Sequence, residues 1–185
     1  MSLHRFNARN GWDRPTDGAL DSDQTILIVF AVARPDGVLA DELHSLHRTF
    51  PNSVLIGCSS SGEIYGEELS DDSIVVAVMR FERTRLKLVH TPIDNSHASK
   101  AAGQSLADQL RDDGLRAVFT LTDGLLVNGS AYVEALDNAL PPGVVITGGL
   151  AGDGERFANT WVLCNDCISA GQLVAVGFYG DAVRL

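Results

Sequence analysis

The sequence VLIGCSSSGEIYG, residues 54–66, joins a short apolar run to a turn of small residues that is followed by an acid, Glu63. A second version, VVITGGLAGDGERF, occupies residues 144–157 and carries Asp153 after its glycines. In both versions proline precedes an apolar run typical of a buried strand, and a glycine-containing turn follows it. This matching order predicts that the chain contains two copies of one structural unit.

The segments around the two stretches also correspond. Each stretch is preceded by an apolar run and a helical pattern, and it is followed by a further apolar run. The runs are 26–33, 36–49 and 74–79 in the first unit, and 117–122, 128–139 and 173–179 in the second. We therefore expect two strand-helix-strand-loop-strand pseudo-repeats, at about 25–90 and 116–181. A helix at about 96–112 links them, and an N-terminal arm covers residues 1–24.

The predicted fold class is α/β, with mixed sheets covered by helices on their outer faces. Near-continuous apolar strands such as 26–33 need cover on both faces, and helices supply it. Asp36 is expected to cap the first helix. The runs 74–79 and 86–90 are expected to form a hairpin, because charged residues separate them. Trp161, Val162 and Leu163 predict an extra strand in the second unit.

Composition excludes several classes of function. The 185 residues are 45% hydrophobic, which suits a folded chain with a substantial core, and 24 acids against 14 Lys and Arg give a net charge of -10. Such a charge repels nucleic acid and anionic membrane surfaces. No apolar run approaches the ~20 residues of a membrane span, and no signal peptide begins the chain. Three cysteines fit a reducing compartment, so we expect a cytoplasmic location.

Four short motifs stand out along the chain: residues 56–63 (IGCSSSGE), Thr122-Asp123-Gly124, residues 148–153 (GGLAGD) and residues 174–177 (VAVG). Together they resemble the FIST N-terminal domain, a sensory domain of bacterial signal-transduction proteins. The resemblance implies an intracellular sensor of an amino acid or related metabolite. It also implies histidine kinase, chemotaxis or cyclic-nucleotide partners, and in some relatives haem that senses nitric oxide. Such proteins usually continue into a C-terminal FIST half, which is absent from this sequence.

The two turns supply the candidate ligand-binding residues. Hydroxyls and backbone amides of a glycine-containing loop suit a ligand carboxylate, because they donate hydrogen bonds without a charge to desolvate. These candidates are Cys58, Ser59, Ser60, Ser61, Gly149 and Gly152. The acids Glu63, Asp123 and Asp153 are candidates for a ligand ammonium group, with Asp153 the first choice. The alternative is ordinary turn chemistry, in which a carboxylate accepts bonds from local amides.

Catalytic and metal-binding alternatives are weaker. A nucleophile at Cys58 or a neighbouring serine would make a hydrolase, but the Gly-x-Ser-x-Gly pattern and a positioned His are both missing, so no catalytic residue is assigned. Cys164 and Cys167 form one CxxC without the second pair of a zinc site, so no metal ligand is assigned either. His44 and His47 share a helix face whose neighbours indicate solvent. A haem cofactor remains open and unassigned.

Overall fold

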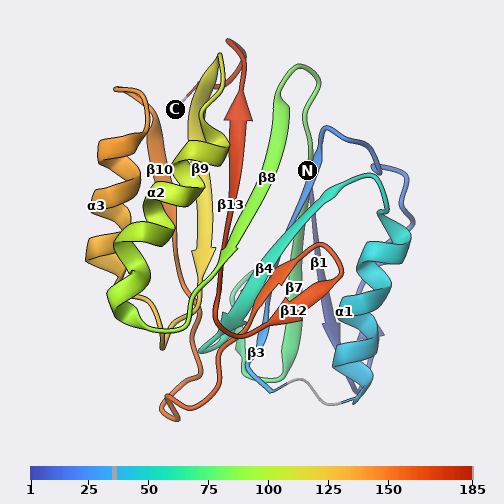
Figure 1. Ribbon diagram of the computed structural model, residues 1–185. Coiled ribbons are helices and arrows are strands. Elements are labelled where there is room, and N and C mark those ends of the chain that lie inside the picture. Colours follow the sequence, from blue (N-terminus) through green and yellow to red (C-terminus); the bar gives the residue numbers. More distant parts are fainter. Residues whose placement is uncertain (35–36, 185) are drawn as a thin grey trace.

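The computed structural model describes residues 1–34 and 37–184, and its framework is two mixed β-sheets (Figure 1). The first has the strand order β12-β11-β4-β3-β7-β1-β2, and the second has the order β10-β9-β13-β8. The strands of the first sheet are β1 (Ser2–Asn7), β2 (Gly11–Trp12), β3 (Thr25–Val32), β4 (Val54–Ser60), β7 (Ser73–Arg80), β11 (Val162–Cys164) and β12 (Cys167–Ser169). Those of the second are β8 (Arg85–Pro92), β9 (Leu115–Thr122), β10 (Val145–Leu150) and β13 (Gln172–Tyr179). A small ribbon, β5 (Glu63–Tyr65) and β6 (Glu68–Ser70), projects from the first sheet.

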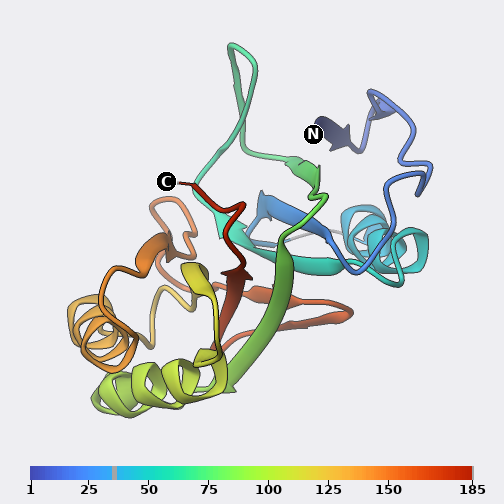
Figure 2. The ribbon, with the colours of Figure 1, turned by 90° about the horizontal axis from the view of Figure 1, so that it is seen from above.

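Helices cover the outer face of each sheet, as the mixed α/β prediction requires. They are α1 (Gly37–Thr49), α2 (Ser99–Leu110) and α3 (Gly129–Ala139), with a short 3-10 turn at Ser96–Ala98. Leu39, Leu43 and Leu46 of α1 pack on the first sheet, whereas α2 and α3 pack on the second. A third cluster, which includes Ile26, Ile56 and Val174, lies between the inner faces. Figure 2 shows α1 and the α2–α3 pair at opposite sides, with the sheets between them. The predicted fold class is confirmed.

The two predicted units share one topology. In the first, β3 is parallel to β4 and antiparallel to β7, and in the second β9 is parallel to β10 and antiparallel to β13. A glycine at the matching place in each sheet lies directly against the neighbouring backbone. A Cβ on Gly57 would lie 2.6 Å from the Val29 carbonyl oxygen, and one on Gly148 would lie 1.8 Å from that of Thr120. Descent from one duplicated unit stays a prediction.

Gly148→Ala is expected to lower the free energy of unfolding by about 1–3 kcal/mol, because the added methyl overpacks the β9–β10 contact. The clash is with backbone, which cannot rotate away as a side chain can. Gly149→Ala is the matched control, since a Cβ at that position meets no atom within 4 Å. Urea unfolding of the two variants measures the difference. Equal stabilities would contradict the close approach.

Two sequence predictions about the strands are wrong. The expected hairpin of 74–79 with 86–90 does not form, because β7 lies in the first sheet and β8 pairs with β13 in the second. The reason is that β1 occupies the free edge of β7. Residues 1–24 are also not simply an arm, since β1 and β2 belong to the sheet and His4 and Phe6 are buried. In their pairing, β8 beside β13 corresponds to β1 beside β7.

The extra strand predicted at 161–163 is confirmed as β11, which forms a hairpin with β12. Its position was not expected, because this hairpin of the second unit joins the first sheet, where β11 pairs antiparallel with β4. The CxxC lies at the hairpin turn, with Cys164 directly opposite Cys167. By crossing to β4, the hairpin places the loop before it beside the turn that follows β4.

The linking helix at about 96–112 is confirmed as the 3-10 turn and α2. The capping role predicted for Asp36 lies outside the described residues. No helix in the described parts of the chain is long and apolar enough to cross a membrane.

Candidate functional site

The turn after β4 and the loop after β10 are in direct contact. The amide of Gly152 donates to the carbonyl oxygen of Ser59 at 2.9 Å, and the amide of Gly154 donates to Oγ of Ser61 at 3.0 Å. Gly152 is required for this contact, because a Cβ at that position would lie 2.4 Å from Oγ of Ser61. The two corresponding turns of the pseudo-repeats thus meet at one place.

A hollow of about 440 Å³ opens where the two turns meet. Its lining comes from the end of β3, from both turns and from the segment after β6, and it consists of Val32, Ser60, Ser61, Gly62, Asp71, Gly154, Glu155 and Arg156. This volume lies within the range of pockets that bind small molecules. The lining is more polar than is usual for such pockets, and it places one cation and two carboxylates around a single space.

Arg156 connects the hollow to the buried acid of the second loop. Its Nε donates to Oδ1 of Asp153 at 2.7 Å, and about half of the Arg156 side chain is exposed. No hydrogen bond joins its two Nη groups to the described residues 1–34 and 37–184. The edge of the guanidinium that suits a carboxylate fork is therefore available to a molecule in the hollow.

The carboxylate of Asp153 accepts hydrogen bonds from residues of its own loop. Besides Arg156, its carboxylate accepts from the amides of Ala158 at 3.1 Å and Asn159 at 2.9 Å. Burial opposes ionisation of this carboxyl, but the bonds from Asn159, Arg156 and Ala158 outweigh it and hold the pKa of Asp153 below its usual value. The geometry favours the turn interpretation of Asp153 over direct contact with a ligand, because the side chain is buried and absent from the lining.

Asp123 connects three segments of the second unit. Its Oδ1 accepts from the amides of Leu125 and Leu126, both at 2.8 Å. Its Oδ2 accepts from Oγ1 of Thr160 and from the amide of Gly171, both at 3.0 Å. The side chain is 1% exposed, so these four donors occupy the carboxylate. This position favours a structural role for Asp123, which orders the loops around β11 and β12.

Glu63 lies behind the serine turn, not in the hollow. Its Oε1 accepts from Oγ of Ser60 at 2.6 Å, and its Oε2 accepts from Oγ of Ser73 at 3.1 Å. Burial raises the pKa of Glu63 above its ordinary value of 4.5, although the bonds from Ser60 and Ser73 act in the opposite direction. The carboxyl fixes the orientation of Ser60, which lines the hollow.

The raised pKa of Glu63 predicts a pH dependence of stability. A carboxyl with a raised folded pKa contributes stability below the unfolded pKa of about 4.5, and this contribution is lost as pH rises through the folded pKa. Glu63→Gln removes this titration and keeps the size and an acceptor. The stability of the wild type relative to Glu63→Gln should therefore fall between pH 4 and pH 8. Denaturant unfolding across this range tests the sign, and a rise with pH would contradict it.

The remaining residues of the first turn divide between core and hollow. Ser59 is buried and pairs with Trp161 by its amide and its hydroxyl, so it joins the hairpin to β4. Cys58 is 3% exposed in the core between the sheets, and burial raises the pKa of its thiol to about 12. A thiol with this pKa stays protonated at neutral pH, which makes it a poor nucleophile. Ser60 and Ser61 are the candidates from this turn that line the hollow.

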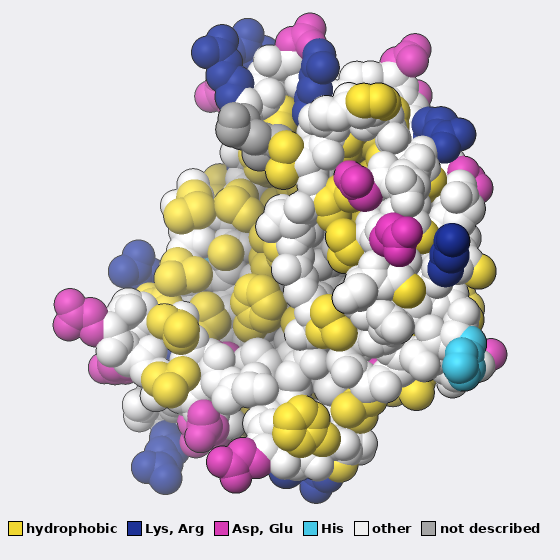
Figure 3. Space-filling view, turned by 90° about the vertical axis from the view of Figure 1, so that its left-hand side faces the viewer, with side chains coloured by type: hydrophobic (Ala, Val, Ile, Leu, Met, Phe, Trp, Pro, Cys, Tyr) yellow, Lys and Arg dark blue, Asp and Glu magenta, His cyan; other side chains and the backbone are white. Residues whose placement is uncertain are grey.

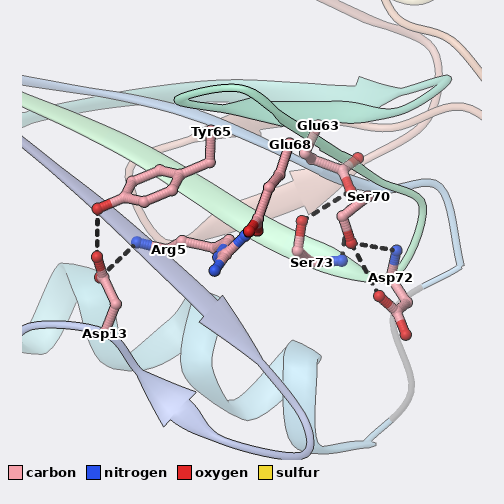
Figure 4. Close-up of polar contacts among 8 residues, drawn as sticks. All are labelled: Arg5, Asp13, Glu63, Tyr65, Glu68, Ser70, Asp72 and Ser73. Atoms are coloured by element: carbon pink, nitrogen blue, oxygen red, sulfur yellow. Dashed lines mark hydrogen bonds and ion pairs between the residues drawn. The ribbon is translucent and has the colours of Figure 1, made fainter.

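The β5–β6 ribbon adjoins the hollow and is held to the N-terminal strands (Figure 4). Arg5 of β1 forms an ion pair with Glu68 and lies over the ring of Tyr65, with its guanidinium carbon 4.9 Å from the ring centroid. Tyr65 donates to Asp13, and Asp13 also accepts from the amide of Arg5. The ribbon lies between Gly62 and Asp71, which both line the hollow. The N-terminal strands, which the sequence did not predict, thus hold one wall of the site in place.

Other predicted or alternative site residues lie elsewhere. Gly149 borders a separate depression between α3 and β10. An apolar hollow of about 360 Å³ between the sheets includes Met79, Phe119 and Phe178 but none of the described histidines. His44 is exposed on α1, and His47 is partly buried. Among residues 1–34 and 37–184 no three His, Cys, Asp or Glu side chains group as metal ligands.

Sequence reasoning missed Asp71, Glu155 and Arg156 as lining residues. Arg156 carried a signal, because it is the one Lys or Arg in the two stretches 54–66 and 144–157. A cation isolated in a glycine-rich loop is a candidate for binding a carboxylate. The sequence carries no comparable signal for Asp71, since its position in the hollow depends on how the β5–β6 ribbon folds back.

Comparison with protein families assigns the class of the chain. The model of the FIST N domain matches residues 25–185, and no curated protein matches the chain. The chain therefore belongs to the FIST N family, whose members are sensory domains of signal-transduction proteins. The resemblance noted in the sequence is confirmed. The strand β1 lies before the matched region and still completes the first sheet.

Proposed function

We propose that this FIST N domain senses a small zwitterionic metabolite of the amino-acid class, and that the ligand binds in the hollow between the two turns. The observation that carries the proposal is the convergence of both turns on one polar hollow, which contains Arg156 with its Nη groups available and the carboxylates of Asp71 and Glu155. An α-amino acid has a carboxylate and an ammonium group on one carbon, so it can meet both charges in a small space.

Each end of such a ligand has partners in the hollow. The carboxylate pairs with the Nη edge of Arg156 and with the hydroxyl groups of Ser60 and Ser61. The ammonium group pairs with Asp71 or Glu155, which are both exposed and both line the hollow. Asp153 contributes by orienting Arg156 through the Nε contact. This assignment replaces Asp153 with Asp71 and Glu155 as the ammonium partners.

The signal would pass to histidine kinase, chemotaxis or cyclic-nucleotide enzymes in the cytoplasm, as expected for a sensory domain of this family. Free thiols at Cys58, Cys164 and Cys167 are consistent with a reducing compartment. The route by which binding is transmitted would run through the β5–β6 ribbon, because that ribbon connects the wall of the hollow to β1 and β2. In this proposal the domain binds and does not catalyse.

A thermal-shift screen tests the proposal. The panel contains the common amino acids, and the matched controls are their decarboxylated amines and deaminated acids, which each keep one of the two charges. A ligand present at 100 times its Kd adds about 2.7 kcal/mol of stability. We expect at least one amino acid to raise the melting temperature and both of its single-charge analogues to raise it less. Equal shifts for an amino acid and its amine would contradict the carboxylate contact to Arg156.

A further inference from the structure

Strand β10 is exposed in a way that the rest of the sheet is not. It lies at the end of the second sheet, and four of its residues in succession, Thr147, Gly148, Gly149 and Leu150, are exposed. Val145 and Leu150 are 45% and 49% exposed. A strand that pairs in parallel is normally buried on both faces. In the described part of the chain, β9 is the one strand that pairs with β10. Every second residue of β10 therefore directs its backbone N–H and C=O groups away from β9, toward the open edge of the sheet.

The corresponding strand of the first unit has its edge covered. There β4 pairs on one side with β3 and on the other with β11, which runs antiparallel to it from Cys58 to Ile56. Because β4 and β10 occupy the same place in their units, the comparison indicates what fits the open edge. The missing element is a short, apolar strand that runs antiparallel to β10.

The sequence around β10 lacks the charges that protect exposed edges. Residues 138–152, NALPPGVVITGGLAG, contain no Lys, Arg, Asp, Glu or His, although the whole chain carries a net charge of -10. Natural edge strands are usually blocked by charged side chains that prevent pairing with other chains. By contrast, the edge strand β8 at the other end of this sheet carries Arg85, Lys87 and His90.

Figure 3 looks onto the β10 side of the molecule. Hydrophobic side chains gather over a large part of this face, whereas many of the Lys, Arg, Asp and Glu side chains lie toward its margins. Val133 of α3 and Leu150 of β10, which are 46% and 49% exposed, line one depression on the helix side of this strand. Exposed apolar side chains gathered on one face are typical of an interface.

We infer that β10 pairs antiparallel with β10 of a second copy of this chain across a two-fold axis near Gly148. The two four-stranded sheets then form one continuous sheet. With the axis at Gly148, Ile146 of one copy lies opposite Leu150 of the other, so apolar side chains meet on the helix side of both sheets. The glycines at the centre let the two backbones approach without a side-chain conflict.

A second copy supplies the element that fits this edge, because its β10 is short and uncharged and a two-fold axis makes it antiparallel to the first β10. Two chains that each carry -10 repel one another over most of their surfaces, and the uncharged stretch 138–152 is where this repulsion is weakest. The dimer should therefore strengthen as salt is added, because salt screens the long-range repulsion and leaves the apolar contact in place.

Sedimentation velocity over a range of chain concentrations tests the inference. The wild type is expected to pass from monomer to dimer. Thr147→Lys should raise the dimer Kd at least tenfold, because each lysine lies opposite Gly149 of the other copy and the two added charges lie close to the axis, where they repel. Val145→Lys is a second variant with the same expected direction, at a side chain already 45% exposed. Ile64→Lys is the matched control, since Ile64 is 71% exposed on the β5–β6 ribbon and should leave the Kd unchanged.

Hydrogen exchange locates the contact independently. Amides of residues 145–150 should exchange more slowly as the wild-type concentration rises, and this protection should be absent in Thr147→Lys. A wild type that stays monomeric at every concentration would overturn the inference. So would a dimer that Thr147→Lys and Val145→Lys leave intact, or concentration-dependent protection that appears at β8 instead of β10.

Discussion

Replacing Asp123 by alanine is expected to lower the free energy of unfolding by about 3–5 kcal/mol. The carboxylate is buried and accepts from four donors, and its removal leaves the amides of Leu125, Leu126 and Gly171 without their acceptor. These bonds lie in partly buried positions, where a donor that loses its acceptor is costly. The loss is large because one side chain holds three separate segments together.

Calorimetric melting measures this effect, which for a chain of this size corresponds to about 2–4 °C for each kcal/mol. Asp71→Ala is the matched control, because Asp71 is exposed and its removal leaves no buried donor unpaired. The melting temperature of Asp123→Asn should lie between those of Asp123→Ala and Asp71→Ala, since the asparagine amide keeps one acceptor oxygen. A melting temperature for Asp123→Ala within a degree of the wild type would contradict the structural role that the contacts assign to this acid.

Arg156→Gln is expected to weaken binding of the responsive amino acid by about 10-fold to 100-fold, the equivalent of one charge-assisted hydrogen bond to a carboxylate. Glutamine keeps a donor but loses the charge and the fork of the guanidinium. Arg156→Lys retains the charge without the fork, so its affinity should lie between those of the wild type and Arg156→Gln.

Titration calorimetry with the amino acid that gives the largest thermal shift measures these affinities. Arg83→Gln is the control, because it removes one exposed cation at a separate depression and keeps the same net charge as Arg156→Gln. If both variants lose affinity equally, the effect is one of overall charge and not of the hollow. Unchanged binding by Arg156→Gln would remove Arg156 from the proposed site.

Repetition made much of the fold predictable from the sequence. Proline, apolar run and glycine turn recur at 54–66 and 144–157, and local periodicity identified β3, α1, β9 and α3 around them. The exchange of strands between units was not predictable in this way. β8 pairs with β13 and not with β7, because β1 occupies the edge of β7. The sequence of β1, Ser-Leu-His-Arg-Phe-Asn, gives no strong strand signal, since a charged residue lies between its buried positions.

The site was predictable only in part, for a physical reason. Residue type indicated that the two turns carry useful chemistry, and Ser60 and Ser61 do line the hollow where the turns meet. Residue type could not show in which direction each side chain points. Cys58 and Ser59 point to opposite faces of β4, and both are buried because both faces are covered there. The buried acids Asp123 and Asp153 accept bonds from their own loops. Asp71 enters the hollow through tertiary folding of the ribbon.

The central claim is that both turns form one binding site for an amino acid, and the amide NMR spectrum of the whole chain tests it most directly. Titration with each amino acid of the panel should shift the amides of residues 60–62 and 154–156 together, with one common Kd. The amides of residues 145–150 and those around Met79 should not follow that titration. Shifts confined to the apolar hollow near Met79, or no saturable shift for any amino acid at residues 60–62 and 154–156, would contradict the account.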